Sequence, residues 1–337
     1  MKPTVAFYTH LTVDYPDLLA EFRSRREEVR LLLVAESGVE HPGAKTVDLK
    51  TALAEAEVLV APPLSREELD RTEKLKLHII PFAGVNRAPL SWYREHNVLL
   101  ASSHGNAPAV AERAVALALA AAGRIVEFDR DLRRGEWHRN RSESNPFDFW
   151  RSLRGAKTTI LGAGAIGRES ARLLRPLVGS ITAVRRSPRT ETPEPFDRVT
   201  TNIGEGMTGT GLVIAALPLT TETRGILRRN HFDAADRPVF VNVSRAEIIE
   251  EETLFALLTE KIVSAAGLDV WYRYPDPFWG PQVPNRFSQL DNVVLSPHAG
   301  SHAEEGKVGQ LRGALTILAE YLSTGGVAER VRPEVGY

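Results

Sequence analysis

Short apolar runs alternate with amphipathic stretches along almost the whole chain. In the first hundred residues, the apolar runs predict strands at 5–8, 29–35, 58–61, 78–82 and 98–102. Helical patterns lie between them, for example at 17–28 and 67–75. Strands that alternate with helices in this way are typical of a parallel sheet covered by helices. The first third of the chain is therefore predicted to form a parallel α/β unit.

A second α/β series begins near residue 106 with a long, alanine- and leucine-rich helical pattern at 109–134. A polar connector that contains several aromatic residues follows at 135–150. Further strands are predicted at 158–161, 181–184, 212–216, 239–243, 263–268 and 293–295. The last helical pattern covers 303–322. Because one sheet rarely holds so many strands, we expect two parallel sheets in two domains.

Composition narrows the class of protein. The chain has 337 residues, 43% of them hydrophobic, and a net charge of −1. This length suits about two domains, and the balanced charge favours neither nucleic acid nor an anionic membrane as a partner. The absence of cysteine excludes disulfides, thiolate catalysis and cysteine-rich zinc sites. With no apolar signal core at the start, we predict a cytoplasmic protein that has no metal site and acts on small molecules.

Three glycines in the middle of the chain form the most informative motif. Gly162, Gly164 and Gly167 stand between the predicted strand 158–161 and a helical pattern at 165–174. Glycines in this context allow a tight turn, close backbone approach to a pyrophosphate, and close packing of helix on strand. The helix N-terminus then favours the negative phosphates. We therefore predict a dinucleotide site here, although a chain with 25 glycines also produces such turns by chance.

Further short segments occur in a fixed order around the glycine loop. They are Asn-Ala-Pro-Ala-Val-Ala-Glu at 106–112, Leu-Pro-Leu-Thr at 217–220, Val-Asn-Val-Ser-Arg at 241–245, Gly-Leu-Asp-Val at 267–270 and Ser-Pro-His at 296–298. In this order they resemble the D-isomer-specific 2-hydroxyacid dehydrogenase family over nearly the whole chain.

The resemblance implies a domain organisation. A doubly wound, Rossmann-type cofactor domain at 106–295 is expected to be inserted into a flavodoxin-like substrate domain made of 1–105 and 296–337. Both domains are then α/β with parallel sheets. Because family members pair through their cofactor domains, a homodimer is also implied, and the long helix with Trp137 beyond it is a candidate face.

Arg245 and His298 are the catalytic residues that the resemblance implies. The family's arginine binds the substrate carboxylate and polarises the carbonyl, for which a planar, permanently charged guanidinium is suited. The family's histidine is the acid/base, and imidazole titrates near neutral pH. Without the surrounding motifs, Arg245 is better explained as a surface arginine at a strand end. Two other histidines, His104 and His302, compete for the acid/base role because both are expected near the domain hinge.

Other contacts are implied in the same way. Asp269 matches the family's contact to the nicotinamide carboxamide; the alternative is an aspartate that caps a turn at a strand end. Ala83, Gly84 and Val85 resemble the loop whose backbone N–H groups hold the substrate carboxylate; the alternative is a simple turn after a strand. The remaining cofactor contacts are predicted at Ala165, Ile166, Leu217, Pro218 and Val243.

The chain departs from the family at the partner of the histidine. The family's acidic residue stands five positions after Asp269, where this chain has Tyr274. A carboxylate stabilises a charged imidazole much more than a neutral phenol does. Related formate dehydrogenases carry a neutral glutamine there, and this chain shares their Asp-Val-Trp sequence at 269–271. We interpret this as loss of the histidine–carboxylate pair; the alternative is a slip in register, although the nearest carboxylate, Asp276, follows a proline.

A second departure concerns the cofactor. NAD-binding folds place an acidic residue about 20 residues past the glycines, where it bonds the ribose hydroxyls. Here the strand 181–184 is followed by Arg185, Arg186 and Ser187. Two cations and a hydroxyl attract a 2′-phosphate, so NADP is predicted in preference to NAD. The alternative is an ordinary basic strand end on the surface.

These observations favour an NADP(H)-dependent reductase of 2-keto acids, which is a 2-hydroxyacid dehydrogenase. Tyr272, Tyr274, Phe278 and Trp279 favour a substrate bulkier or more apolar than glyoxylate. Oxidation of a small anion such as formate is the alternative within enzymes, because a neutral partner of the histidine permits it. A dinucleotide-sensing binding protein is the alternative outside enzymes, but such a protein has no need of both Arg245 and His298.

Overall fold

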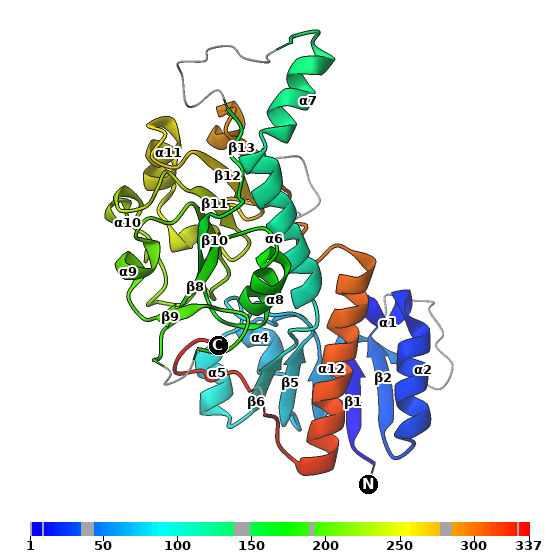
Figure 1. Ribbon diagram of the computed structural model, residues 1–337. Coiled ribbons are helices and arrows are strands. Elements are labelled where there is room, and N and C mark those ends of the chain that lie inside the picture. The colour runs from blue at the N-terminus through cyan, green and yellow to red at the C-terminus, as the bar shows by residue number, and fades with distance from the viewer. Residues whose placement is uncertain are drawn as a thin grey trace. The chain divides into compact units, whose positions relative to one another are not determined.

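The computed structural model describes residues 2–8, 10–34, 44–137, 149–188, 192–276, 285–328 and 330–337. The chain divides into two compact units. The terminal unit consists of Met1–Asn106 and His302–Tyr337, and the central unit consists of Ala107–Ser301. Each unit contains one sheet in which all paired strands are parallel (Figure 1). The predicted fold class, two parallel α/β domains, is confirmed.

The terminal unit holds a six-stranded sheet with the order β3-β2-β1-β4-β5-β6. Its strands are β1 (Thr4–Phe7), β2 (Arg30–Val34), β3 (Lys45–Val47), β4 (Val58–Val60), β5 (Leu77–Ile80) and β6 (Leu99–Ser102). If the short edge strand β3 is set aside, the order is that of a flavodoxin-like sheet. The sequence did not predict β3, because this strand has three residues and its first two, Lys45 and Thr46, are polar.

Helices cover both faces of this sheet. They are α1 (Leu11–Asp14), α2 (Pro16–Arg25), α3 (Leu49–Glu55), α4 (Arg66–Leu69), α5 (Leu90–Glu95) and α12 (Glu304–Thr324). One hydrophobic cluster joins Phe22 of α2 and Leu318 of α12 to the sheet. A second cluster joins Leu53 of α3 and Trp92 of α5 to the other face. Figure 1 shows α12, in orange, beside the blue N-terminal elements, so the two ends of the chain build one core.

The central unit holds a seven-stranded sheet with the order β13-β12-β11-β10-β7-β8-β9. Its strands are β7 (Lys157–Leu161), β8 (Ser180–Val184), β9 (Arg198–Thr200), β10 (Leu212–Ala215), β11 (Val239–Asn242), β12 (Ala265–Leu268) and β13 (Val293–Leu295). The order reverses between β7 and β10, as in doubly wound dinucleotide-binding folds, whose ligands lie outside the carboxyl ends of the strands at this switch point. The glycine loop follows β7 directly and therefore lies at this point.

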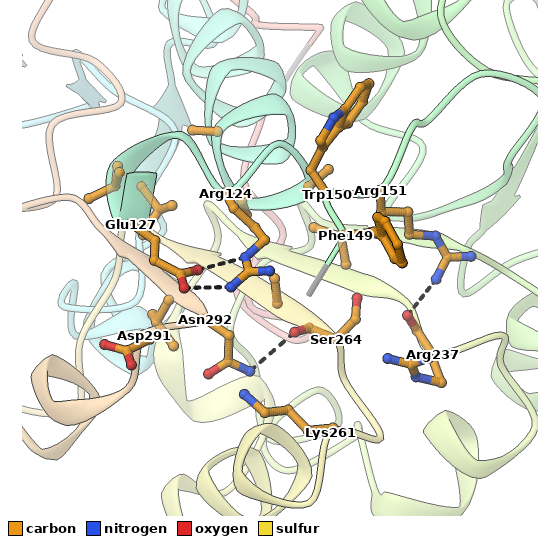
Figure 2. Close-up of a pocket in the computed structure, with 18 of the residues that line it drawn as sticks. Arg124, Glu127, Phe149, Trp150, Arg151, Arg237, Lys261, Ser264, Asp291 and Asn292 are labelled. Carbon is orange, nitrogen blue, oxygen red and sulfur yellow. Dashed lines mark hydrogen bonds and ion pairs between the residues drawn. The ribbon is translucent and has the colours of Figure 1, made fainter. Parts of the chain in front are cut away.

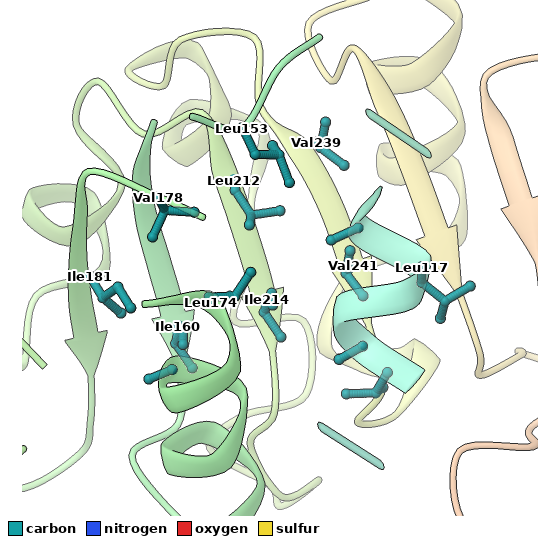
Figure 3. Packing of buried hydrophobic residues seen from close by; sticks show 14 of the residues in the cluster. Leu117, Leu153, Ile160, Leu174, Val178, Ile181, Leu212, Ile214, Val239 and Val241 are labelled. Carbon is teal, nitrogen blue, oxygen red and sulfur yellow. The ribbon is translucent and has the colours of Figure 1, made fainter. Parts of the chain in front are cut away.

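The helices of the central unit are α6 (Ala107–Ala122), α7 (Ile125–Arg133), α8 (Ala165–Leu174), α9 (Ile203–Met207), α10 (Arg229–Asp233) and α11 (Glu251–Thr259), with short 3₁₀ helices at Ala246–Ile248 and Arg286–Gln289. Figure 3 shows Leu117 of α6 and Leu174 of α8 packed in one hydrophobic cluster with Ile160, Ile214 and Val241 of the sheet. The helices α10 and α11 pack on the opposite cluster.

The single helix predicted at 109–134 is in fact two helices. Gly123 ends α6, and Arg124 then adopts a left-handed conformation with φ of 53°, after which α7 begins. A residue with positive φ cannot continue a right-handed helix. The hydrophobic pattern continued through this break and therefore did not reveal it. Within the described ranges, no helix is both long and apolar enough to cross a membrane.

Candidate functional site

The glycine loop has the geometry that close approach to a ligand requires. Gly162 has φ of 107°, and a Cβ atom there would lie 2.5 Å from the carbonyl oxygen of Ala216. At Gly167, a Cβ atom would lie 1.9 Å from the carbonyl oxygen of Gly162. By contrast, a Cβ atom at Gly164 would meet nothing within 4 Å. Two glycines are thus required by packing, while Gly164, at the N-cap of α8, leaves open space where a pyrophosphate is expected.

The neighbouring strand ends surround this loop. The N–H of Gly162 donates to Val184 at the end of β8, and the N–H of Ala216 donates to Leu161 at the end of β7, both at 2.8 Å. Leu217 packs against the hydrophobic cluster on the α11 side of the sheet. The carbonyl oxygen of Pro218 accepts a hydrogen bond from the Thr223 hydroxyl at 2.6 Å, which fixes the loop after β10.

The other predicted cofactor residues differ in their exposure. Ala165 and Ile166 begin α8, and both are partly exposed. Val243 is 7% exposed and belongs to the hydrophobic core, so its side chain contributes to packing. Its N–H donates to the carbonyl oxygen of Ala215 at 3.3 Å.

The basic residues after β8 lie at the carboxyl edge of the sheet. The N–H of Arg185 donates to Thr200 at 3.0 Å and so prolongs the pairing of β8 with β9. Arg186 and Ser187 are exposed. The guanidinium of Arg186 lies 3.7 Å from the carboxylate of Glu222, in the loop after β10. This cation is thus directed toward the loop that follows β10.

Arg245 stands in a turn that follows β11. Asn242, which is 1% exposed, uses both ends of its amide to hold this turn. Its Oδ1 accepts hydrogen bonds from the N–H and the hydroxyl of Ser244, and its Nδ2 donates to the carbonyl oxygen of Arg245 at 2.9 Å. Sequence reasoning missed this role of Asn242. The available signal was an amide at the end of an otherwise apolar strand.

His298 lies in the loop after β13 and has a left-handed backbone with φ of 57°. Its ring is beside that of Tyr274, with the two centroids 5.4 Å apart and the planes tilted by 41°. The Tyr274 hydroxyl accepts a hydrogen bond from the N–H of Trp271 at 3.2 Å. Burial raises the pKa of the Tyr274 phenol, against opposing effects of that N–H and of the Arg245 guanidinium. Tyr274 is therefore neutral and within electrostatic reach of both predicted catalytic residues.

Asp269 follows β12 directly and is 2% exposed. Its carboxylate accepts hydrogen bonds from the Ser296 hydroxyl and from the N–H groups of Ala299 and Gly300, the last two at 2.9 Å. It thus caps the loop that carries His298.

The aromatic residues near Tyr274 are only partly described. The Tyr272 hydroxyl donates to the carbonyl oxygen of Ile249 at 2.8 Å, and burial raises its pKa. Tyr272 therefore supports the fold around the site. Phe278 and Trp279 lie outside the described residues.

The predicted substrate loop belongs to the terminal unit. Ala83 and Gly84 are partly exposed after the carboxyl end of β5, whereas Val85 is 4% exposed in the core of that unit. The competing histidines, His104 and His302, also belong to the terminal unit. Among the described residues, no group of three or more His, Cys, Asp or Glu side chains could hold a metal ion.

The central unit also contains a pocket of about 530 Å³ that the sequence did not predict (Figure 2). It is lined by Val239, Ala265 and Val293, which begin β11, β12 and β13, and by residues of α6, α7 and 149–151. Because the strands are parallel, this pocket lies at the amino ends of the strands, whereas the glycine loop lies at their carboxyl ends. It is therefore separate from the site of Arg245 and His298.

Comparisons with known proteins agree with this arrangement. The family model "D-isomer specific 2-hydroxyacid dehydrogenase, NAD binding domain" matches residues 115–300. Glyoxylate/hydroxypyruvate reductase B from Enterobacter agglomerans is 30% identical over 67% of this chain and 68% of its own length. D-3-phosphoglycerate dehydrogenase from Archaeoglobus fulgidus is 25% identical over 78% of this chain, and the chain spans 50% of the length of that relative.

A solved structure extends the likeness to the whole fold. The NADPH-dependent glyoxylate/hydroxypyruvate reductase from Sinorhizobium meliloti, in complex with NADP and malonate, superimposes with a TM-score of 0.73. Its sequence is 20% identical, and the match covers 99% of this chain and 98% of that one. The ordered motifs, the switch-point glycine loop and the matched family model together identify the chain as a member of the D-isomer specific 2-hydroxyacid dehydrogenase family.

Proposed function

We propose that this protein is an NADP(H)-dependent reductase of 2-keto acids, that is, a 2-hydroxyacid dehydrogenase. The observation that carries the proposal is the position of Tyr274. Its ring contacts the ring of His298, and its hydroxyl lies within electrostatic reach of Arg245. A permanent cation and a proton-transfer group are thus grouped on loops at one edge of the sheet that carries the glycine loop.

Each side chain has a defined task in this proposal. Arg245 binds the substrate carboxylate and polarises the keto oxygen, since a guanidinium can donate to two oxygens at once. His298 supplies the proton to the oxygen that becomes a hydroxyl. A bound reduced nicotinamide supplies the hydride. Ala83, Gly84 and Val85 hold the carboxylate through backbone N–H groups. Tyr274 stands where the family has an acidic residue that pairs with the histidine.

The preference for NADP rests on Arg185, Arg186 and Ser187. Replacing Arg185 by Asp and Arg186 by Ala should reverse the order of kcat/KM for NADPH and NADH. The expected loss with NADPH is about 10- to 100-fold, the scale of hydrogen bonds to a charged group. Arg228→Ala, which removes a cation near α10 in the same unit, is the control. Equal use of both cofactors by the unaltered protein would refute this preference.

A panel of 2-keto acids, assayed with NADPH by loss of absorbance, tests the proposed reaction. Reduction of at least one 2-keto acid is expected, with pyruvate, glyoxylate, hydroxypyruvate and phenylpyruvate as the probes. Because Tyr274 is a neutral partner of His298, oxidation of formate is the second candidate, and the same panel includes formate with NADP and NAD. Binding of NADPH with no turnover of any of these would instead favour a dinucleotide-sensing protein.

We also propose that the chain forms a homodimer through α7. Ile125, Val126 and Leu132 of this helix are half or more exposed, whereas Asp131 is buried. An apolar helix face directed toward water indicates a binding surface. Figure 1 shows α7 extending beyond the strands of the central unit, and the pocket of Figure 2 lies at its base. A projecting helix and a pocket on one unit can pair reciprocally across a two-fold axis.

Light scattering after gel filtration tests the dimer. The unaltered protein should elute with twice the mass of the chain, and Leu132→Glu should give the single mass. Leu173→Glu, on the exposed side of α8, is the matched control and should remain dimeric. A single-chain mass for the unaltered protein would contradict the proposal. The cytoplasmic location that the sequence indicated remains a prediction.

A further inference from the structure

The loop 296–300 holds His298 in a backbone conformation that needs support. With φ of 57°, this residue is in the left-handed region, which side chains other than glycine rarely adopt. The N–H of His298 donates to the carbonyl oxygen of Ser296 at 3.0 Å, so the chain turns sharply just before the imidazole. Such conformations persist where the surrounding contacts fix them.

The Asp269 carboxylate supplies three contacts to this loop. It accepts three hydrogen bonds, from the Ser296 hydroxyl before His298 and from the Ala299 and Gly300 N–H groups after it. A Cβ atom at Gly300 would lie 2.9 Å from Asp269 Oδ2, so glycine allows the carboxylate to reach this backbone. The carboxylate thus joins both sides of the turn that carries His298.

Trp271 supports the same loop from two residues further along. Its indole Nε1 donates to the carbonyl oxygen of Ser296 at 2.9 Å. The N–H of Ser296 in turn donates to the carbonyl oxygen of Leu268 at 2.8 Å. The segment 268–271 therefore contacts Ser296 at its N–H, its carbonyl and its hydroxyl.

We propose that Asp269 is a positioning residue for His298, with Trp271 as a second support. The inference rests on the proposed function, in which His298 transfers the proton. A carboxylate has about four acceptor positions, and three are occupied by the loop. The contact to a nicotinamide carboxamide that the family resemblance implies does not explain these three bonds.

Hydrogen–deuterium exchange of the cofactor-free protein tests the positioning role without any assay of activity. Asp269→Asn places an amide N–H₂ against backbone donors, so exchange at Ala299 and Gly300 should become at least about tenfold faster. Asp197→Asn is the matched control, because Asp197 also accepts from a backbone N–H, that of Ile181 at 2.7 Å, on the β8–β9 side of the same unit. The control should leave exchange in 296–300 unchanged. Unchanged exchange in Asp269→Asn would overturn the proposal.

Kinetics then separate positioning from cofactor binding. For Asp269→Asn, kcat should fall by about 10-fold or more while the Kd for NADPH changes by less than about threefold. A loss of NADPH affinity as large as the loss of kcat/KM, with unchanged exchange, would assign Asp269 to the cofactor alone and overturn the inference.

If Asp269→Asn does not fold, two other variants test the inference. Ser296→Ala and Trp271→Phe each remove one contact and should also speed exchange in the loop. If neither does, the inference is wrong. Full activity of His298→Ala would refute the proposed function, whereas faster exchange in Asp269→Asn would still show that the carboxylate holds the loop.

Discussion

Each unit of the molecule contains a histidine beside a tyrosine, and the two pairs differ in their burial and hydrogen bonding. In the terminal unit, His78 and Tyr93 have ring centroids 5.9 Å apart, with planes tilted by 39°. In the central unit, His298 and Tyr274 are 5.4 Å apart and tilted by 41°. The ring geometry is nearly the same. What differs is the hydrogen bonding of the tyrosine hydroxyl and the burial of the histidine.

In the first pair, the polar atoms of His78 are both engaged inside the core. The carbonyl oxygen of Ala61, 3.1 Å from Nε2, can only accept a hydrogen bond, so Nε2–H is the donor. Nδ1 therefore accepts a hydrogen bond from the Tyr93 hydroxyl at 2.7 Å. The side chain is fully buried, and burial lowers the pKa of His78 to about 4. This histidine is neutral near pH 7 and serves the structure.

In the second pair, the Tyr274 hydroxyl bonds the backbone N–H of Trp271, and its contact with His298 is between the two rings. His298 is partly exposed and stands on a loop with a left-handed backbone. A histidine beside a tyrosine can therefore be fully enclosed in the core, as His78 is, or partly exposed on a loop, as His298 is.

The largest effect is expected from Arg245, the cation within reach of the second pair. Arg245→Ala should lower kcat/KM for a 2-keto acid by about 10³-fold, because a charged group that stabilises developing negative charge is lost. Binding of NADPH, measured by fluorescence, should change little. Arg245→Lys keeps the charge but not the planar fork, and should recover only part of the loss. An Ala variant with unaltered turnover would remove Arg245 from the mechanism.

Replacing each histidine in turn tests whether the two pairs differ in function. His298→Ala should lower kcat by about 10² or more, the usual scale of a general acid. His78→Gln is the matched control in the terminal unit and should keep kcat within about twofold once folded, since His78 has no role in proton transfer. Steady-state rates at saturating substrate decide this. Equal losses in the two variants would contradict a role in proton transfer for His298 alone.

The buried pair makes its own prediction about stability. Below pH 6.5 the unfolded chain protonates this histidine, whereas folded His78 stays neutral until about pH 4. The unfolded state then binds more protons, so this histidine lowers the free energy of unfolding as pH falls from 7 to 4, by about 3 kcal/mol at most. Denaturant unfolding of the unaltered protein and of His78→Gln at pH 7, 5.5 and 4 measures this. The variant should show the shallower fall; parallel curves would contradict the assignment.

The sequence predicted the elements that carry continuous apolar runs. The helix α8 (Ala165–Leu174) has the predicted bounds, and the predicted strands overlap observed ones. The edge strands β3 and β9 were missed because each has three residues with polar side chains at most positions. The break between α6 and α7 depends on the backbone of Arg124, which no hydrophobic pattern reports.

For the candidate site, motif order located the loops but not their internal bonds. The family resemblance implied that the residue five positions after Asp269 lies beside the histidine, and the structure brings the rings of Tyr274 and His298 together. The roles of Asn242 and Trp271 depend on hydrogen bonds to backbone atoms of their own or neighbouring loops. Such bonds form only once distant strands align, so local sequence does not reveal them.

We propose that His298, beside a neutral Tyr274, supplies the proton for reduction, and one measurement tests this proposal most directly. The pH dependence of kcat/KM for 2-keto acid reduction is compared among the unaltered protein, Tyr274→Glu and Tyr274→Gln, in which glutamine has the shape of glutamate without its charge. Because reduction needs a protonated imidazole, kcat/KM should fall as pH rises; this decrease is the falling limb of the profile. A carboxylate stabilises a charged imidazole, so in Tyr274→Glu the falling limb should move about one pH unit higher. Tyr274→Gln adds no charge and should leave the limb in place. Coincident falling limbs for the Glu and Gln variants would contradict the claim.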